Sequence, residues 1–365
     1  MLSPKIKRNI SRIIPFGVFW VIFGLIFSII EKGVLGDLDY YPSTKNPYNF
    51  SGMIFINAAS TLVAGLFLGT IEILYFSKLF TQTCFSKKIV YKTTIYLVII
   101  FIFLLVFTLI SNSVKFQTNL FDKDVWFSLW AFLSNFAFWS VVLYISAIIP
   151  LSLFYAEVSD NLGQGVLINF FTGKYHTPTE EERIFMFLDM KSSTTIAEKL
   201  GHVSYFELLR EYYSDLSDSI IEYSGEIYQY IGDEIVVSWK LKPGLHNNNC
   251  VQCFYAIRDS LNKQAEKYNK KFGLLPTFKA GFHFGKVTTG EIGVIKKAII
   301  FTGDVLNTTA RIQGLCNYYK ADLLISHDLM EKLNLGSKFQ IKSLGEKDLR
   351  GRDKKVELFT VLKNS

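Results

Sequence analysis

The stretch IYQYIGDEIVVSW, residues 227–239, decides how the second half of this chain is interpreted. Two β-branched and aromatic runs flank a Gly-Asp pair, which is typical of a β-hairpin with Gly232 and Asp233 in its turn. A hairpin tip is a common place for an acidic residue, so Asp233 and Glu234 by themselves indicate no site. Their meaning depends on which polar residues the rest of the chain brings near them.

The composition is unusual for a soluble protein. Half of the 365 residues are apolar, 16% are aromatic and only 19% are charged. Four long uncharged runs precede residue 157, and most of the charged residues follow it. The net charge of +7 lies largely beside those runs, so we do not interpret it as a sign of nucleic-acid binding.

The cysteines predict neither a disulfide framework nor a clear metal site. Cys84, Cys250, Cys253 and Cys316 are few, which suits a reducing compartment. Cys250 and Cys253 form a CxxC pair, but no second pair or nearby histidine completes a zinc site. We expect both to be small buried side chains on a helix, and a bound metal is the less favoured alternative.

Four apolar segments are long enough to cross about 30 Å of hydrocarbon as helices. They are residues 13–30, 53–76, 93–111 and 126–150. Buried helices of a large soluble protein are the alternative, but four such runs so close together favour a membrane bundle. We therefore expect residues 1–154 to form a four-helix transmembrane domain in contact with the lipid bilayer.

The basic residues predict the orientation of this bundle. The first segment follows a basic N-terminus, is too long for the apolar core of a signal peptide and has no small-residue cleavage site. The loop between the second and third segments carries four lysines and no acidic residue, whereas the other two loops mix both signs. The positive-inside rule then places both termini in the cytoplasm of a multi-pass protein of the cell inner (plasma) membrane.

The bundle gives few functional signals of its own. It contains no histidine, which argues against a haem held by two histidines between helices. Glu72 lies near the cytoplasmic end of its segment, where it either extends its carboxylate to the interface or takes part in sensing. No row of acids suggests a transport path. Residues 155–182 then form a connector through which bundle movement would have to pass.

From residue 183 onward, strand and helix patterns alternate and predict an α+β domain over 183–365. The apolar strand RIFMFLDM, 183–190, ends beside Asp189, and Ser192 or Ser193 could cap the helix that follows. Next come a helix over 203–223, the hairpin and a helix over 249–272. Two strands over 276–285 and 286–293, a helix over 304–315 and a terminal hairpin over 342–362 complete the expected order.

Two aspartates and two other polar residues form a candidate site in this domain. Asp189 ends a strand beside a helix N-terminus, and Asp233 lies at a hairpin tip. Two carboxylates that converge beside free helical N–H groups can hold Mg²⁺ or Mn²⁺ together with a polyphosphate. Asn307 and Arg311 are four residues apart and so share one helix face, where they could orient a sugar and stabilise charge on a phosphate.

Three stretches carry a family resemblance. FLDMKSST (187–194), YIGDE (230–234) and GDVLNTTAR (303–311) resemble the signature stretches of the class III nucleotidyl cyclase catalytic domain. The resemblance covers about residues 180–363, and the order and spacing of the three stretches make it specific. Combined with the apolar half, it suggests a membrane-anchored adenylate cyclase of the bacterial type, with a ferredoxin-like α+β core.

The resemblance implies an activity and a set of site residues. Such an enzyme converts ATP to cyclic AMP and pyrophosphate as a head-to-tail homodimer, with each site shared by two chains. Asp189, Asp233 and the backbone of Met190 would hold two Mg²⁺ or Mn²⁺ ions. Asn307 and Arg311 would come from the partner chain. The remaining substrate-binding candidates are Lys191, Ser192, Ser193 and Thr194 after the first aspartate, and Arg350, which could equally be a surface arginine.

The positions that select the purine depart from the family pattern. Gln229 stands where adenylate cyclases usually have Lys and guanylate cyclases Glu. Ile300 stands where a residue that contacts adenine is usual, and Thr302 follows two residues later. The Gln229 amide can serve either purine, and Ile300 offers no hydrogen bond. We expect ATP as the substrate; a guanylate or dual-purine cyclase, and a nucleotide-binding receptor with a catalytically weak domain, are the alternatives.

Overall fold

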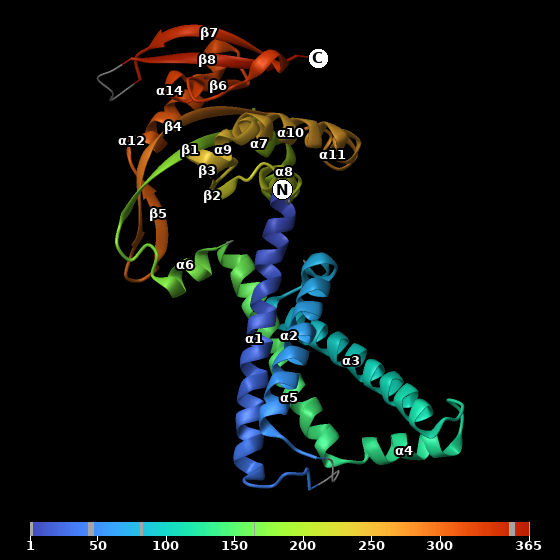
Figure 1. Cartoon of the computed structure of the whole chain (residues 1–365). Helices are drawn as coiled ribbons and strands as arrows, with labels where there is room; N and C mark the ends of the chain where they lie inside the picture. Colours follow the sequence, from blue (N-terminus) through green and yellow to red (C-terminus); the bar gives the residue numbers. More distant parts are fainter. Residues whose placement is uncertain (1–2, 43–46, 81–82, 164, 350–354, 365) are drawn as a thin grey trace. The chain divides into compact units, whose positions relative to one another are not determined.

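The structure is a computed structural model that describes residues 3–42, 47–80, 83–163, 165–349 and 355–364 (Figure 1). The chain divides into two compact units, one comprising Ile6–Ile168 and the other mainly Asn169–Ser365. Helices make up the first unit and a mixed α/β sheet domain makes up the second. The expected fold class, apolar helices followed by an α+β domain, is therefore confirmed.

Among its described residues, the first unit has four helices that are long and apolar enough to cross a membrane. They are α1 (Pro4–Leu35), α2 (Phe50–Leu74), α3 (Phe85–Phe116) and most of α5 (Phe136–Leu162). A 3₁₀ turn, η1 (Phe76–Lys78), follows α2, the shorter α4 (Lys123–Leu133) lies between α3 and α5, and α6 (Val166–Thr172) follows α5. The number of apolar spans agrees with the sequence-based prediction.

The bounds of the fourth expected span, 126–150, are wrong. The helix is interrupted at Ser134–Asn135, between α4 and α5. Trp139 Nε1 donates to the Leu133 carbonyl at 2.8 Å and so satisfies one acceptor at the break. Beyond it, α5 continues to Leu162, into the expected connector. Ser134 and Asn135 are polar, but apolar residues lie on both sides of them, so an average of hydropathy over the segment does not locate the break.

Small residues allow α1 and α2 to pack closely. A Cβ atom at Gly65 would lie 2.7 Å from the Phe16 carbonyl oxygen, and one at Gly69 would lie 2.9 Å from Phe16 Cβ. The two glycines are four residues apart on one face of α2, which is the spacing that favours close helix packing in membranes. The surrounding core includes Trp20 and Leu68.

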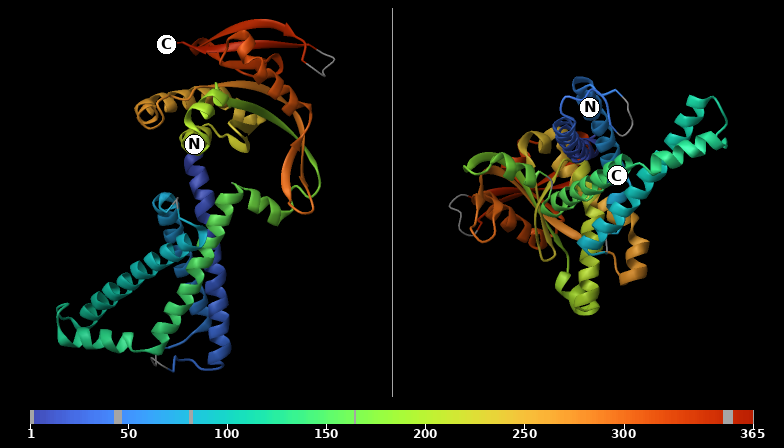
Figure 2. Two further views of the ribbon diagram at one scale, coloured as in Figure 1. Left: turned by 180° about the vertical axis from the view of Figure 1, so that it is seen from behind. Right: turned by 90° about the horizontal axis from the view of Figure 1, so that it is seen from below.

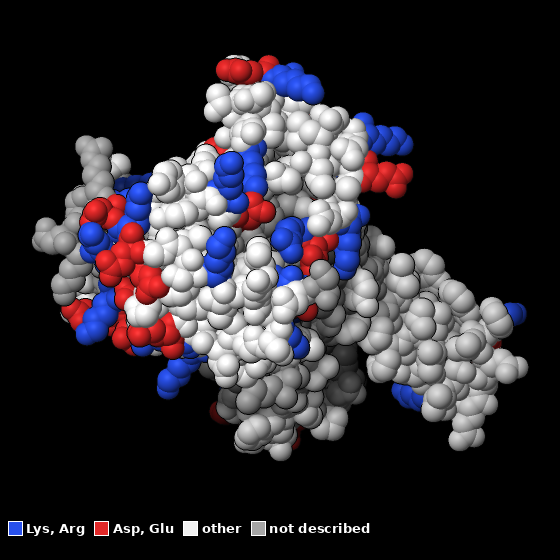
Figure 3. All heavy atoms as spheres, turned by 90° about the horizontal axis from the view of Figure 1, so that it is seen from above, with Lys and Arg blue, Asp and Glu red and all other residues white. Residues whose placement is uncertain are grey.

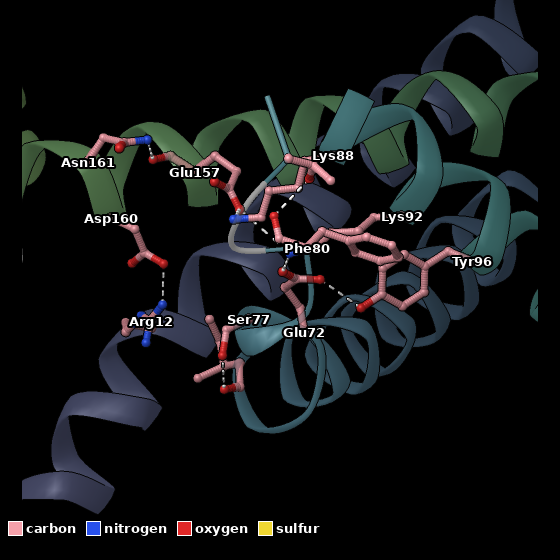
Figure 4. Close-up of polar contacts among 12 residues, drawn as sticks. Arg12, Glu72, Ser77, Phe80, Lys88, Lys92, Tyr96, Glu157, Asp160 and Asn161 are labelled. Carbon is pink, nitrogen blue, oxygen red and sulfur yellow. Dashed lines mark hydrogen bonds and ion pairs between the residues drawn. The ribbon is translucent and has the colours of Figure 1, made fainter. Parts of the chain in front are cut away.

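A network of charged side chains joins three helices of the first unit (Figure 4). Lys92 Nζ of α3 lies 2.5 Å from Glu72 Oε1 of α2 and 3.6 Å from Glu157 Oε1 of α5. Lys88 Nζ lies 2.6 Å from the same Glu157 oxygen, and Tyr96 Oη donates to Glu72 Oε2 at 2.9 Å. Glu72 is only 3% exposed. Its carboxylate is therefore paired inside the bundle and does not extend to an interface.

A second ion pair lies one helical turn further along α5. Asp160 bonds Arg12 of α1 (Figure 4). Through Glu157 and Asp160, the last turns of α5 are attached to α1 and α3, and through Lys92 they are linked to α2. Every helix that could span a membrane thus contributes to the charged contacts at this end of α5.

The second unit is built on one eight-stranded sheet. Its strands are β1 (Thr179–Met190), β2 (Glu226–Ile231), β3 (Glu234–Lys240), β4 (Phe278–Ile292), β5 (Ala298–Thr302), β6 (Leu323–Ser326), β7 (Phe339–Lys347) and β8 (Val356–Lys363). The order is β2-β3-β1-β4-β6-β8-β7, with β5 paired to β4. Only the β4–β6 pair is parallel among these neighbours. Figure 2 shows the long strands β1 and β4 curving side by side.

The two strands expected over 276–285 and 286–293 form one strand, because β4 runs without a break from Phe278 to Ile292. The helices are α7 (Ser193–Leu200), α8 (His202–Glu222), α9 (Leu241–Leu245), α10 (Asn249–Lys263), α11 (Ala265–Phe272), α12 (Asp304–Gly314), α13 (Cys316–Tyr319) and α14 (His327–Met330). Two 3₁₀ turns are η2 (His246–Asn248) and η3 (Gly336–Lys338). The expected helix over 249–272 is divided at Gln264 between α10 and α11. Ser192 precedes α7 in a left-handed conformation and its side chain makes no capping bond.

Each face of the sheet has its own apolar core. One core joins the even-numbered side chains of β1, such as Met186, to α8 and α10. The other joins Phe185 and Phe187 to Val305 of α12. A Cβ at Gly281 of β4 would lie 2.4 Å from the Gln313 backbone nitrogen, so glycine there lets α12 lie directly on the sheet. Asp189 is odd-numbered and therefore belongs to the α12 face.

The cysteines are free, and Cys84 is exposed while the other three are buried. Cys250 and Cys253 are fully buried on α10, which confirms their expected place as small side chains in a helix. On the surface, positive and negative residues lie close together in the view from above (Figure 3). The second unit contains ion pairs between residues of opposite charge, such as Lys271–Glu211 and Lys363–Asp259.

Candidate active site

The sheet brings both predicted aspartates to the same end of neighbouring strands. Asp189 is the penultimate residue of β1, and Asp233 lies in the turn between β2 and β3. In the β1–β3 register Asp189 pairs with Glu234, the residue that follows Asp233. Gly232 has φ +63°, a value that suits glycine in a tight turn. The sequence-based expectation of a hairpin with its acidic residue at the tip is correct.

Tyr213 of α8 fixes the position of this tip. Its hydroxyl donates to the Gly232 carbonyl at 2.8 Å and lies 3.4 Å from the Glu234 carbonyl oxygen. Its ring packs on Tyr230, with the centroids 4.6 Å apart. A helix that belongs to the core thus holds the turn that carries Asp233, which is the kind of support a site requires for fixed geometry.

The local electrostatics favour a bound cation. Burial, followed by the facing carboxyl of Asp233, raises the pKa of Asp189. Burial and the two neighbouring aspartates raise the pKa of Glu234 to about 7. Lys279 Nζ lies 3.3 Å from Asp189 Oδ2 and offsets part of this negative charge. Three acids around one lysine leave a surplus of negative charge that a divalent ion would neutralise.

The available oxygens also fit a hard divalent cation. Asp233 Oδ2 is buried and has no hydrogen-bond partner among the described residues. A buried, unpaired carboxylate oxygen is costly and favours a ligand. Within the described ranges no group of three or more His, Cys, Asp or Glu side chains converges as a metal site. An ion here would therefore take the two aspartates and complete its coordination with backbone, phosphate or water oxygens.

Two neighbours of Asp189 are absent from the sequence-based prediction. Gln313 Nε2 of α12 donates to Asp189 Oδ2 at 3.1 Å, and Lys279 of β4 is its register partner. Neither lies in a recognisable motif with Asp189. Lys279 could be found only from the β1–β4 register, and Gln313 only from the close approach of α12 to the sheet.

Asn307 and Arg311 lie on α12, as expected, but none of the contacts found in the described chain joins them to the aspartates. Asn307 is exposed. Arg311 is half-buried, and its Nη1 has no hydrogen-bond partner among the described residues. Gln313 is the α12 residue that reaches Asp189 of the same chain. The structure thus separates the predicted residues into two groups.

The residues after Asp189 are arranged around the start of α7. Lys191 donates its backbone N–H to the Thr277 carbonyl at 2.8 Å, and its ammonium group binds Asp322. Met190 is buried. Ser192 is the left-handed residue before the helix, and Ser193 and Thr194 form its first turn. Their backbone N–H groups are the free donors of a helix N-terminus.

The predicted base-selecting residues lie on β2 and β5. Gln229 is exposed and pairs with Val236 of β3. Ile300 is half-buried, and Thr302 is exposed with its hydroxyl 3.3 Å from the Thr288 carbonyl oxygen. Strand alternation directs Phe301 to the opposite face from Ile300 and Thr302.

Arg350, the looser prediction for phosphate binding, lies outside the described residues.

Residues 176–363 match the family described as the adenylate and guanylate cyclase catalytic domain. The chain belongs to this family. Because the match covers more than half of the chain, it identifies the second unit as a cyclase domain. The two aspartates, Asn307 and Arg311 all fall within the matched residues.

Two relatives and one solved structure are similar to this chain. Adenylate cyclase 2 of Rhizobium meliloti (strain 1021) is 32% identical over 226 residues, which is 62% of each protein. The adenylate cyclase of Anabaena cylindrica is 24% identical over 188 residues, 48% of this chain and 36% of that protein. The structure of a bacterial light-regulated adenylyl cyclase has a TM-score of 0.52 at 19% identity and covers 62% of this chain and 66% of its own. That structure supports the fold, and this chain spans less than two thirds of the length of either curated relative.

Proposed function

We propose that this protein is a membrane-bound adenylate cyclase that converts ATP to 3′,5′-cyclic AMP and pyrophosphate. The observation that carries the proposal is the pair of facing carboxyls, Asp189 and Asp233, at a strand end and a hairpin tip of a cyclase-family domain. The names of the curated relatives support ATP as the nucleotide.

In this proposal the chain's own residues bind and orient the triphosphate. Asp189, Asp233 and the Met190 carbonyl would hold two Mg²⁺ or Mn²⁺ ions, which neutralise phosphate charge and favour ionisation of the ribose 3′-hydroxyl. The N–H groups of Ser193 and Thr194 would donate to phosphate oxygens. Lys191 would have to leave Asp322 to reach a phosphate.

A homodimer would supply the missing half of each site. Asn307 is exposed and Arg311 Nη1 has no described partner, so both remain able to bind a nucleotide held by a second chain. Asn307 would position the ribose and Arg311 would stabilise charge on the reacting phosphate. Dimerisation through the cyclase domain, and also through the membrane bundle, belongs to this proposal.

The first unit would anchor the enzyme in the inner membrane. We propose a transmembrane domain over about 1–154, a connector over 155–182 and a cyclase domain over 183–365, with both termini in the cytoplasm. The four apolar helices support this arrangement, and so do Lys78 of η1 and the three lysines at the start of α3, which are Lys87, Lys88 and Lys92.

The main test is cyclic AMP production by the full-length protein in detergent with ATP and Mn²⁺. Asp189→Asn and Asp233→Asn should each abolish activity. Asp259→Asn removes an exposed aspartate that pairs with Lys363, and it should retain full activity as the matched control. Full activity in either site variant would refute the metal assignment.

Complementation tests the shared site. Asp189→Asn and Arg311→Ala should each be inactive alone, but a mixed dimer of the two contains one intact site and one doubly altered site. Co-expression of the two variants should therefore restore part of the activity, whereas co-expression of Asp189→Asn with Asp233→Asn should not. Equal results from both mixtures would contradict a site shared between two chains.

A guanylate or dual-purine cyclase is the second candidate. Gln229 can donate to or accept from either base, and Ile300 offers no hydrogen bond that would exclude guanine. Parallel assays with ATP and GTP under the same conditions would distinguish these activities. A larger kcat/KM for GTP would replace the adenylate cyclase proposal.

A further inference from the structure

A buried arginine connects four strands on the α12 face of the sheet. Arg183 lies on β1, six residues before Asp189, and is 2% exposed. Its Nε donates to Glu181 Oε2 at 2.8 Å, and its Nη1 donates to Glu226 Oε2 of β2 at 2.8 Å and to Ser238 Oγ of β3 at 3.1 Å. These three bonds fix the guanidinium plane.

The same guanidinium group covers an aromatic ring of β5. Its central carbon lies 4.5 Å from the centroid of the Phe301 ring. Among the described strands β5 pairs only with β4, so β5 has no backbone pairing with β1, β2 or β3. Arg183 stacks on β5 and is hydrogen-bonded to β2 and β3, so it restrains the position of β5 relative to these two strands through side-chain contacts alone.

Tyr228 completes this contact between β2 and β5. The Tyr228 and Phe301 ring centroids are 4.7 Å apart, and the Phe301 backbone N–H donates to the Tyr228 hydroxyl at 3.3 Å. The β2–β3 register shifts between Ile227 and Gln229, so Tyr228 lies at a β-bulge. Bulges of this kind redirect a side chain. We call Arg183, Tyr228 and Phe301 the β2–β5 clamp.

Two members of the clamp are adjacent in sequence to predicted base-selecting residues. Tyr228 precedes Gln229, and Phe301 lies between Ile300 and Thr302. Because the Ile300 side chain has no polar group, hydrogen bonds to a purine would come from Gln229 on β2 and from Thr302 and the backbone groups on β5. The distance between the two strands then decides whether both sets can reach one base.

We propose that Arg183 is a positioning residue for the purine, acting through the β2–β5 clamp and without contacting the nucleotide. It holds Gln229 and the backbone of β5 at the separation that one purine fits. This inference rests on the proposed cyclase function and adds to it the origin of base selection. If the clamp is loosened, the kcat/KM values for ATP and GTP should become more nearly equal.

A purely structural arginine would behave differently from a positioning residue. Loss of a buried, paired guanidinium would then lower thermal stability but leave the ratio of ATP to GTP use unchanged. Glu226 has a side chain that is 56% exposed and can be rehydrated when its partner is lost. Arg183→Lys keeps one positive charge but cannot form the three hydrogen bonds and the stacking contact with Phe301 together. Tyr228→Phe removes only the hydroxyl that accepts from the Phe301 backbone N–H of β5.

The matched control is Tyr175→Phe. The Tyr175 hydroxyl donates to Glu181 Oε1 at 2.9 Å, so the control removes one hydroxyl from the same network without touching Phe301. For each full-length variant, kcat and KM with ATP and with GTP are measured together with the melting temperature. The dissociation constants of fluorescent ATP and GTP analogues are measured in parallel, and they report on the clamp even if turnover is lost.

Tyr228→Phe and Arg183→Lys should raise the KM for ATP and move the ATP-to-GTP ratio of kcat/KM toward unity by about fivefold, the effect of one hydrogen bond. Their kcat should change less than their KM, and Tyr175→Phe should match the wild type in the purine ratio. The positioning role would be overturned if Tyr228→Phe and Arg183→Lys both kept the wild-type ATP-to-GTP ratio, in kcat/KM and also in the dissociation constants of the analogues. Absence of any cyclic product from the wild type would instead refute the cyclase proposal, and the analogue ratio would still decide the role of the clamp.

Discussion

Removal of the Lys92 ammonium group should strongly destabilise the first unit. Lys92 is 1% exposed and lies between Glu72 and Glu157, while the ion pair of Lys88 among the described residues is with Glu157. In Lys92→Met, Glu72 would keep the Tyr96 hydroxyl but lose its cation. A buried carboxylate without its partner has little access to water and remains uncompensated.

The magnitude follows from the charges and their burial. Two unit charges about 4 Å apart at an effective dielectric constant of about 20 interact by about 4 kcal/mol. Breaking a buried ion pair by removing one partner costs about 3–5 kcal/mol. For a unit of this size, about 2–4 °C of melting temperature corresponds to 1 kcal/mol. The variant should therefore melt about 6–20 °C below the wild type.

Tryptophan fluorescence during heating in detergent is a suitable assay, because Trp20, Trp126, Trp130 and Trp139 lie in the first unit and only Trp239 lies in the second. Lys87→Met, an exposed lysine on the same helix, is the matched control and should melt with the wild type. The double variant Glu72→Gln/Lys92→Met removes both charges and should recover most of the loss. A single variant that melts with the control, or a double variant no better than the single, would refute this reasoning.

Three further predictions concern the second unit and the thiols. Tyr213→Phe removes the 2.8 Å bond to the Gly232 carbonyl and should lower kcat about fivefold with little change in KM, as measured by steady-state kinetics; an unchanged kcat would show that the turn needs no such support. Gly281→Val would force a side chain against Gln313 and should destabilise the cyclase domain by about 1–3 kcal/mol or more. Thermal unfolding followed by circular dichroism measures this loss. Gly314→Ala is the control and should not lower the stability, because a Cβ atom there meets nothing within 4 Å. At pH 7.5 a membrane-impermeant maleimide should label Cys84 alone, because hydrogen bonds lower the pKa of its thiol while burial raises the pKa of the Cys250 thiol to about 12. Labelling in inside-out vesicles but not in intact cells is expected if Cys84 faces the cytoplasm, as proposed. Labelling of intact cells would contradict that orientation.

Local sequence signals were sufficient for several elements of the fold. The Gly-Asp turn, the strand that ends near Asp189 and the helix that carries Asn307 and Arg311 each depend on neighbouring residues alone. Their predicted positions match the structure because turn chemistry and apolar periodicity act over a few residues.

Long-range contacts explain what the sequence could not predict. Lys279 meets Asp189 through a strand register, and Gln313 meets it through the close packing of α12 on Gly281. The partner of Glu72 lies twenty residues away on another helix. The break at Ser134–Asn135 is a polar pair with apolar sequence on both sides, so an average of hydropathy over the segment did not signal it. The roles assigned to the site residues remain predictions.

The placement of Gln313 on α12 has a consequence for a dimeric enzyme. The helix binds Asp189 of its own chain through Gln313, while Asn307 and Arg311 would serve the nucleotide bound by the second chain. A single rigid rod of eleven residues would therefore present a different face to each of two catalytic centres. Occupancy of one centre would shift the rod and alter affinity at the other, so ATP saturation curves of the dimer should depart from a simple hyperbola.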